Sequence, residues 1–312
     1  MIGGSLAYVA LAVTDVEAVA TALARGCGLK RTDRPVGATR RTAPVFGVGA
    51  SAVALFGVGD PFLGGQAKPG VHHIGIGVRD LEGAIRAAAA AGVAAAEQEA
   101  APGLDRGRRV LLCAEGTVGV KTYLSEPLEV DRSRGGWVER IDHLGIASAD
   151  NGAASDAFSR RLGYPLESQQ TDLEVQVALE SFTSDKYGAV YHTRPPEPSG
   201  GLRVAFITVG DCELEFLQDF DPRQGAHVAH DRPGTTKQDQ GAIARFLGSR
   251  GPGLHHIALK VPDINAALAD LHRAGHTLID TVGRPGSRRA LIGFIHPQSM
   301  GGVLMHLVQR SA

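Results

Sequence analysis

The clearest pattern of apolar and polar positions runs through residues 251–309. Apolar side chains alternate with others from Ile257 to Val261, which is the period of a half-buried strand. Asp263 can cap a following helix, whose apolar positions recur at helical spacing until Gly275. Three further segments have the composition of strands: 278–280, 291–296 and 303–308. The stretch therefore predicts one βαβββ unit, whose first and last strands can lie near each other.

The same succession of strand, polar break, helix and glycine occurs four times along the chain. The units begin at Ala7, His72, Asp142 and His255. A polar, glycine-rich stretch at 131–136 separates the second unit from the third. We therefore predict an α+β protein built from four βαβββ modules in two domains, residues 1–130 and 137–312.

Composition limits the classes of function. The 312 residues are 43% apolar and 21% charged, with a net charge of -1, which suits an ordinary globular core. This balance argues against partners such as nucleic acid or a membrane surface, and no apolar stretch is long enough to span a membrane. Three widely spaced cysteines, Cys27, Cys113 and Cys212, indicate reduced thiols, so we expect a cytoplasmic protein.

Four segments of the second half resemble the vicinal oxygen chelate superfamily, which includes glyoxalases and extradiol dioxygenases. They read IDHLGIAS, GLRVAFITVGDCELEFL, ARFLGSRGPGLHHIALKV and FIHPQSMGGVLMHLVQ. Residues 141–309 are similar specifically to methylmalonyl-CoA epimerases, and the four-module pattern extends the superfamily resemblance to the whole chain. The resemblance implies that the modules pair into two half-open barrel domains, of which the second surrounds one divalent metal ion.

The resemblance also implies a metal ligand on the first and last strands of each module. In the second half these positions are His143, Glu215, His256 and His306. The epimerases have a glutamate where this chain has His306, so the implied set is three imidazoles and one carboxylate. Such ligands suit a divalent ion of cobalt, zinc, nickel, manganese or iron.

The matching positions of the first half are Tyr8, Ala54, His73 and Tyr123. His73 alone is an ordinary metal ligand, so we predict that the first half keeps the fold without an intact metal site. His72 and His255 each precede one of the inner histidines. We expect both to point to the opposite face, because successive residues of a strand alternate sides.

A metal ion held in the second half would polarise a carbonyl or enediolate oxygen, and a nearby base could then remove the adjacent proton. The resemblance therefore implies an epimerase, isomerase or lyase whose small-molecule substrate is an acyl-CoA or a 2-oxo acid. Of the family's two catalytic glutamates, one position is His306 and the other falls near Glu197, so these are the predicted catalytic residues. His227 and His230, in a polar segment, are further candidates for the base.

Two other classes of function stay open. With iron, the same centre could bind dioxygen and a substrate of the extradiol or 2-oxo-acid dioxygenases, and the four-module length favours this class. A non-catalytic protein that binds a metal-chelating metabolite is favoured by the missing family base. Because four modules in one chain could imitate the dimer of shorter relatives, both a monomer and a homodimer fit the sequence.

Overall fold

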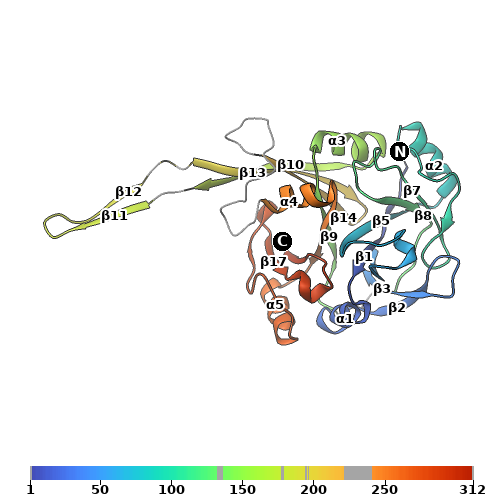
Figure 1. Cartoon of the computed structure of the whole chain (residues 1–312), viewed down its shortest axis with the longest axis horizontal. Helices are drawn as coiled ribbons and strands as arrows, with labels where there is room; N and C mark the ends of the chain where they lie inside the picture. Colours follow the sequence, from blue (N-terminus) through green and yellow to red (C-terminus); the bar gives the residue numbers. More distant parts are fainter. Residues whose placement is uncertain are drawn as a thin grey trace.

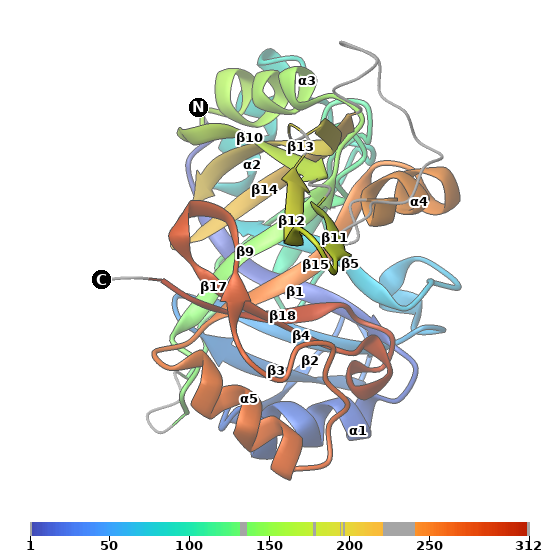
Figure 2. The same ribbon diagram turned by 90° about the vertical axis from the view of Figure 1, so that its left-hand side faces the viewer.

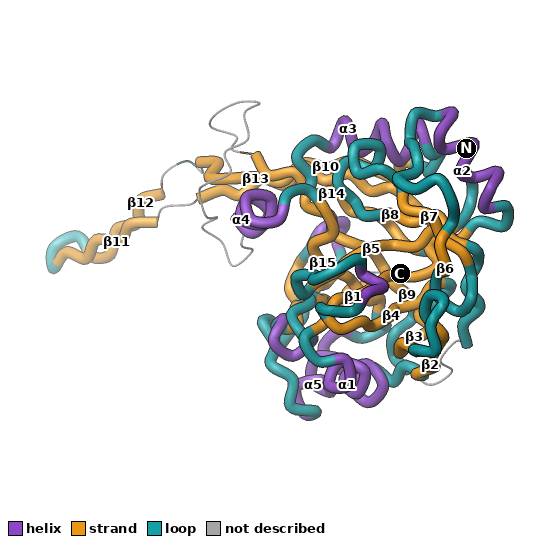
Figure 3. The backbone as a smooth tube through the Cα atoms, turned by 45° about the vertical axis from the view of Figure 1, so that its right-hand side comes forward, coloured by secondary structure: helices purple, strands orange, loops and turns teal. Residues whose placement is uncertain are grey.

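The computed structural model of the chain describes residues 2–131, 136–176, 179–193, 195, 197–220 and 241–310. Within these residues the chain forms two eight-stranded, curled sheets with short helices at their periphery, seen in two views in Figure 1 and Figure 2. A two-stranded hairpin, β11 (Leu179–Ser184) and β12 (Gly188–Thr193), extends away from this body (Figures 1 and 3).

The first sheet has the strand order β2-β3-β4-β1-β5-β8-β7-β6. Its strands are β1 (Ser5–Val13), β2 (Arg31–Pro35), β3 (Thr42–Val48), β4 (Ser51–Gly57), β5 (Gly70–Gly77), β6 (Ala101–Pro102), β7 (Arg108–Leu111) and β8 (Thr122–Ser125). The helices of this half are α1 (Val16–Thr21), continued by a π-helical turn at Ala22–Gly26, and α2 (Leu81–Ala90).

The second sheet repeats this order as β10-β13-β14-β9-β15-β18-β17-β16. Its strands are β9 (Arg140–Ala147), β10 (Leu166–Gln176), β13 (Glu197–Val209), β14 (Cys212–Phe220), β15 (Gly253–Lys260), β16 (Arg284–Pro285), β17 (Leu291–Ile295) and β18 (Met305–Gln309). The accompanying helices are α3 (Asn151–Ser155), continued by a π-helical turn at Asp156–Arg161, α4 (Gly241–Arg250) and α5 (Ile264–Arg273).

The four modules begin in the same way because each places an aspartate between its first strand and its helix. Asp15, Asp80, Asp150 and Asp263 all have extended backbones, and each side chain accepts a hydrogen bond from a backbone N–H of the first helical turn. Such a cap satisfies donors that the helix itself leaves unpaired. The repeated cap explains why the module pattern is legible in the sequence, and the structure confirms the predicted α+β fold of paired modules.

The two halves pack against each other through one continuous apolar core, which contains Val9 and Ile74 of the first half and Leu144 and Ile257 of the second. Backbone contacts join them as well, since the Thr14 amide donates to the Gly301 carbonyl at 3.0 Å. The domain limits at 1–130 and 137–312 remain predictions. None of the described helices is long and apolar enough to cross a membrane.

Candidate metal centre

Four neighbouring strands of the second sheet bring the predicted ligands together. His143 lies on β9 and His256 on β15, which form the central antiparallel pair. Glu215 lies on β14, parallel to β9, and His306 lies on β18, parallel to β15. All four side chains are buried, with exposures between 3% and 6%.

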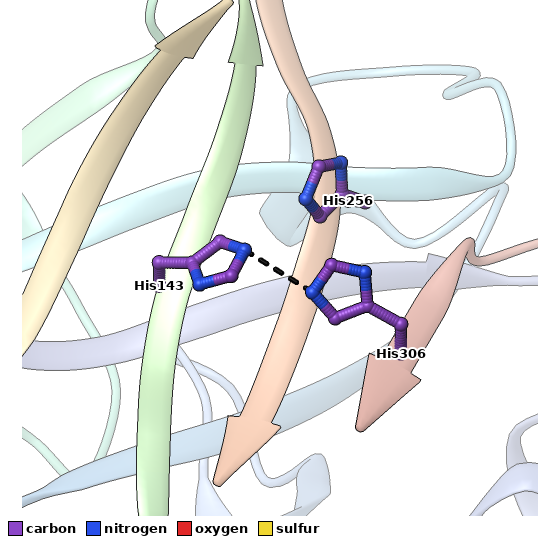
Figure 4. A group of neighbouring side chains, drawn as sticks. All are labelled: His143, His256 and His306. Atoms are coloured by element: carbon purple, nitrogen blue, oxygen red, sulfur yellow. Dashed lines mark hydrogen bonds between the residues drawn. The ribbon is translucent and has the colours of Figure 1, made fainter. Parts of the chain in front are cut away.

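The side chains converge on a single point. The Nε2 atoms of His143 and His306 are 3.1 Å apart. Figure 4 draws this contact as a dashed line beside the His256 ring. Oε2 of Glu215 lies 3.3 Å from Nε2 of His143 and 3.6 Å from Nε2 of His256. Across the described part of the chain, His143, His256 and His306 form the one group of three or more His, Cys, Asp or Glu side chains able to hold a metal ion.

The chemistry of this donor set fits a divalent cation. Burial lowers the pKa of both His256 and His306, so each imidazole is neutral and offers an unprotonated nitrogen, the form that binds a metal. Nε2 of His256 and Nδ1 of His306 are buried without a hydrogen-bond partner among the described atoms. Atoms that each lie about 2.1 Å from one ion are about 3.0–3.4 Å apart at the usual ligand angles, which matches the shorter separations here.

A buried carboxylate orients His143. Oδ2 of Asp142 lies 2.9 Å from Nδ1 of His143, and Nε of Arg310 lies 3.0 Å from Oδ1 of the same carboxylate. Burial would raise the pKa of Asp142, but the hydrogen bonds from His143 and Arg310 outweigh it and hold the pKa well below its usual range. Metal-bound histidines commonly donate their other ring N–H to such a carboxylate. The sequence signal for this role is only the adjacency of Asp142 and His143.

A largely apolar cavity of about 310 Å³ opens from the four candidate ligands. Its apolar walls include Phe206, Leu217, Ile243, Ile292, Phe294 and Val308. Three arginines also line it, and each is balanced by an acidic partner: Arg284 by Asp280, Arg288 by Glu213, and Arg310 by Asp142. The site therefore combines a cluster of metal-type donors with room for a small, mostly apolar substrate.

Comparison with known proteins places the chain in a family. A profile of the glyoxalase/bleomycin resistance protein/dioxygenase superfamily matches residues 142–294. Human mitochondrial methylmalonyl-CoA epimerase is 30% identical over 139 residues, which cover 44% of this chain and 68% of the human protein. The chain belongs to this superfamily.

Other proteins resemble the chain in sequence or in fold. An ethylmalonyl-CoA/methylmalonyl-CoA epimerase of Cereibacter sphaeroides is 26% identical over 176 residues, covering 55% of this chain and 98% of that protein. A variant of 4-hydroxymandelate synthase from Streptomyces coelicolor aligns with 100% of this chain and 94% of its own, with a TM-score of 0.64 and 16% identity. The second likeness shows that the whole chain, and not only its second half, shares the fold of that synthase.

The strand registers relate the two halves of this superfamily member position by position. Four positions of the first half are equivalent to the candidate ligands of the second half: Tyr8 to His143, Ala54 to Glu215, His73 to His256, and Tyr123 to His306. These are the pairs expected from the sequence.

An arginine fills the first barrel where the second barrel has its cavity. Arg109 is 7% exposed, and its guanidinium carbon lies 3.5 Å from the ring centroid of Phe62 and 4.1 Å from that of Tyr123. Nη1 of Arg109 lies 3.1 Å from Nε2 of His73. By strand register Arg109 corresponds to Ile292, a wall residue of the cavity in the second half. The sequence pattern does not reveal this substitution, because Arg109 looks like an ordinary charged residue of a short strand.

The remaining predicted residues have different outcomes. The backbone of Glu197 pairs with Gln176 at the far end of β13, nine positions from Phe206, which pairs with Glu215. At about 3.3 Å per residue this is on the order of 30 Å of strand. The side chain of Glu197 is outside the described structure, so its catalytic role stays a prediction. His227 and His230 lie outside the described residues altogether.

The expectation that His72 and His255 point away from their neighbours is wrong. Nδ1 of His72 lies 2.7 Å from Nδ1 of His73, and Nδ1 of His255 lies 3.0 Å from Nδ1 of His256. His255 also lines the same cavity as His256. The alternation of sides fails because the strand registers shift at both places, as a β-bulge requires.

Proposed function

We propose that this protein is a metal-dependent enzyme for proton transfer next to a carbonyl, as an epimerase, isomerase or lyase of a small acyl-CoA or 2-oxo acid. The observation that carries the proposal is the convergence of His143, Glu215, His256 and His306 at a cavity of about 310 Å³. A divalent ion bound there would polarise a substrate oxygen and make the neighbouring C–H more acidic.

The side chains around the centre support this chemistry. Neutral imidazoles and one carboxylate leave a bound divalent ion with a net positive charge, which favours an anionic enolate-type intermediate. The apolar walls exclude water, which strengthens such electrostatic interactions. Because the lining arginines are already paired with acids, the cavity suits the acyl portion of a substrate better than the phosphates of coenzyme A.

The names of the two epimerases described above support an acyl-CoA substrate, because both enzymes act on malonyl-CoA derivatives. The resemblance implies a glutamate at the position of His306 in methylmalonyl-CoA epimerases, so we propose a related substrate in place of methylmalonyl-CoA itself. We assign His306 to the ion because its Nε2 lies 3.1 Å from Nε2 of His143, within the candidate group of three histidines. Glu197 is the base that the resemblance implies, but its backbone lies on the order of 30 Å along β13 from the partner of Glu215, so we assign no base to the reaction.

The first test is elemental analysis of protein purified without chelator or a histidine tag, beside the variants His306→Ala and Glu197→Gln. We expect about one divalent ion per chain, at least ten-fold weaker binding in His306→Ala, and full binding in Glu197→Gln. Solvent deuterium exchange would then be followed by mass spectrometry in a panel of acyl-CoA thioesters and 2-oxo acids. We expect exchange next to a carbonyl in the wild-type protein and its loss in His306→Ala, whereas Glu197→Gln should keep it.

Two results would contradict this proposal. Bound iron with oxygen uptake, and no exchange, would select the dioxygenase class. A protein that takes up no stoichiometric metal even after reconstitution would favour the non-catalytic binding protein.

A further inference from the structure

Each half of the molecule carries two adjacent histidines whose rings meet edge to face. The ring centroids of His72 and His73 are 5.0 Å apart at 78°, and those of His255 and His256 are 5.3 Å apart at 79°. In both pairs the contact joins Nδ1 to Nδ1, at 2.7 Å and 3.0 Å. A neutral imidazole has one protonated nitrogen, so one ring of each pair donates and the other accepts.

A β-bulge at the same place in both halves creates this arrangement. In β5 the pairing with β1 passes from His73 to Val71 and leaves His72 without a partner position. In β15 the pairing with β9 passes from His256 to Leu254 and leaves His255 out in the same way. A bulge inserts one residue and re-aims its side chain, which places the outer imidazole against the inner one.

The first half determines which ring donates. Arginine has only donors, so Nε2 of His73, 3.1 Å from Nη1 of Arg109, must accept. His73 is fully buried and burial holds its pKa well below the usual range, so the ring is neutral. Nζ of Lys121 lies 3.4 Å from Nε2 of His72, but the shorter Arg109 contact decides the tautomer, because Lys121 donates at 3.0 Å to the Leu63 carbonyl. The single proton of His73 is therefore on Nδ1 and is donated to Nδ1 of His72. The inner histidine thus presents an unprotonated Nε2 to a cation, and the outer histidine receives the proton of the other nitrogen.

The second half has the same arrangement of the two rings, but Ile292 stands at the register position of Arg109, so the chain supplies no guanidinium there. Nε2 of His256 has no hydrogen-bond partner among the described atoms and faces Oε2 of Glu215 at 3.6 Å. The outer ring of His255 is held in place by Phe246 of α4, with ring centroids 5.0 Å apart and an interplanar angle of 86°.

We propose that His255 is a positioning residue of the metal centre, which accepts the Nδ1 proton of His256 and thereby directs the unprotonated Nε2 to the ion. The inference rests on the proposed metal site. It gives an imidazole the role that Asp142 has for His143, because a carboxylate or other acceptor on the outer nitrogen fixes the ring and its proton.

Two substitutions of His255 separate this role from simple packing. His255→Asn keeps an acceptor within reach of Nδ1 of His256, whereas His255→Leu keeps bulk and removes the acceptor. His72→Leu is the matched control, since it removes the corresponding ring in the half without a metal site. Zinc affinity would be measured by competition with a chromophoric chelator, because zinc has no redox chemistry. The protonated nitrogen of His256 would be identified in the metal-free protein by ¹⁵N–¹H correlation NMR, assigned with His256→Gln.

We expect His256 of the metal-free wild-type protein to be protonated on Nδ1. We expect zinc binding to be about 10–100-fold weaker in His255→Leu and within about three-fold of wild type in His255→Asn and in His72→Leu. Protonation of His256 on Nε2, or unchanged zinc affinity in a folded His255→Leu protein, would overturn the inference. If the wild-type protein bound no zinc, the proposed function would fail, but the NMR experiment would still decide the position of the proton.

Discussion

Gly145 shows how little room surrounds the candidate ligands. It pairs with His256 across β9 and β15, and a Cβ atom at this position would lie 2.0 Å from Cε1 and 2.4 Å from Nε2 of that ring. Real Cβ atoms do not approach other atoms so closely, so any side chain here must displace the imidazole. The glycine is therefore part of the centre although it offers no ligand atom.

Replacing Gly145 by alanine is expected to weaken zinc binding at least ten-fold, because His256 can no longer occupy its position. Overpacking should also reduce the free energy of unfolding by about 1–3 kcal/mol. Zinc competition and denaturant unfolding would measure the two effects. Gly75→Ala is the control, since its Cβ would meet the Tyr8 ring at 2.1 Å in the first half. That variant should lose stability and keep its zinc affinity; equal zinc affinity in Gly145→Ala would show that the ring adapts.

At the scale of elements, some features of the structure follow from the local sequence, and others follow only from how the strands pair. The aspartate caps and the alternation in the first strands are local features, so the module pattern was predictable. The four candidate ligands were predictable only through the family resemblance, since no local pattern links His143 to His306. The bulges that turn His72 and His255 depend on the strand opposite, and alternation along one strand could not predict them.

The two barrels are closed differently at their free edges. In the first half, the loop after β6 joins β2 through the backbone, with the Asp105 amide donating to the Pro35 carbonyl at 2.8 Å, and Arg34 pairs with Asp105 at 3.1 Å. In the second half, side chains of the corresponding loop reach β10: Arg288 pairs with Glu167 at 2.8 Å, and Ser287 donates to Asp172 at 3.3 Å. In the first half the strand supplies the arginine and the loop the acid, whereas in the second half the strand supplies the acid and the loop the arginine. Arg288 of the second pair also lines the cavity.

Arg288 has a left-handed backbone, with φ 54°, which costs a residue with a Cβ roughly 1–2 kcal/mol. Both Arg288→Ala and Arg288→Gly lose the ion pair, but only glycine relieves the backbone. We therefore expect Arg288→Gly to be more stable than Arg288→Ala by about 1 kcal/mol in urea unfolding. Arg106, with φ 64° in the first half, is the control, and its Gly and Ala variants should differ in the same direction. Equal stability of the Arg288 pair would mean that the loop relaxes.

At the scale of the whole molecule, the shared core couples the halves, so a destabilised first half should weaken the entire chain. Burial lowers the pKa of His72 to about 4, assisted by Lys121 and Arg109, and holds the pKa of His73 well below its usual value. In the unfolded chain both groups titrate near 6.5 and then bind more protons than the folded state. Their contribution to stability is therefore complete above about pH 6.5 and is lost as the pH falls toward 4.

We expect the metal-free protein to have a lower free energy of unfolding at pH 5.0 than at pH 7.5. Each kcal/mol lost should lower Tm by roughly 1.5 °C in a chain of 312 residues, since the entropy of unfolding is about 2.1 cal/mol/K per residue. Thermal unfolding at several pH values, followed by circular dichroism, would measure the change. A His72→Asn variant should show a shallower dependence, and a Tm that stays constant across this range would contradict the assignment of neutral, buried imidazoles.

Arg109 also bears on how many metal ions the chain would require. The first barrel receives its positive charge during synthesis, so it can be neither starved of an ion nor occupied by the wrong one. The proposed site of the second barrel would alone draw on the cellular pool, which would limit the requirement to one ion per chain.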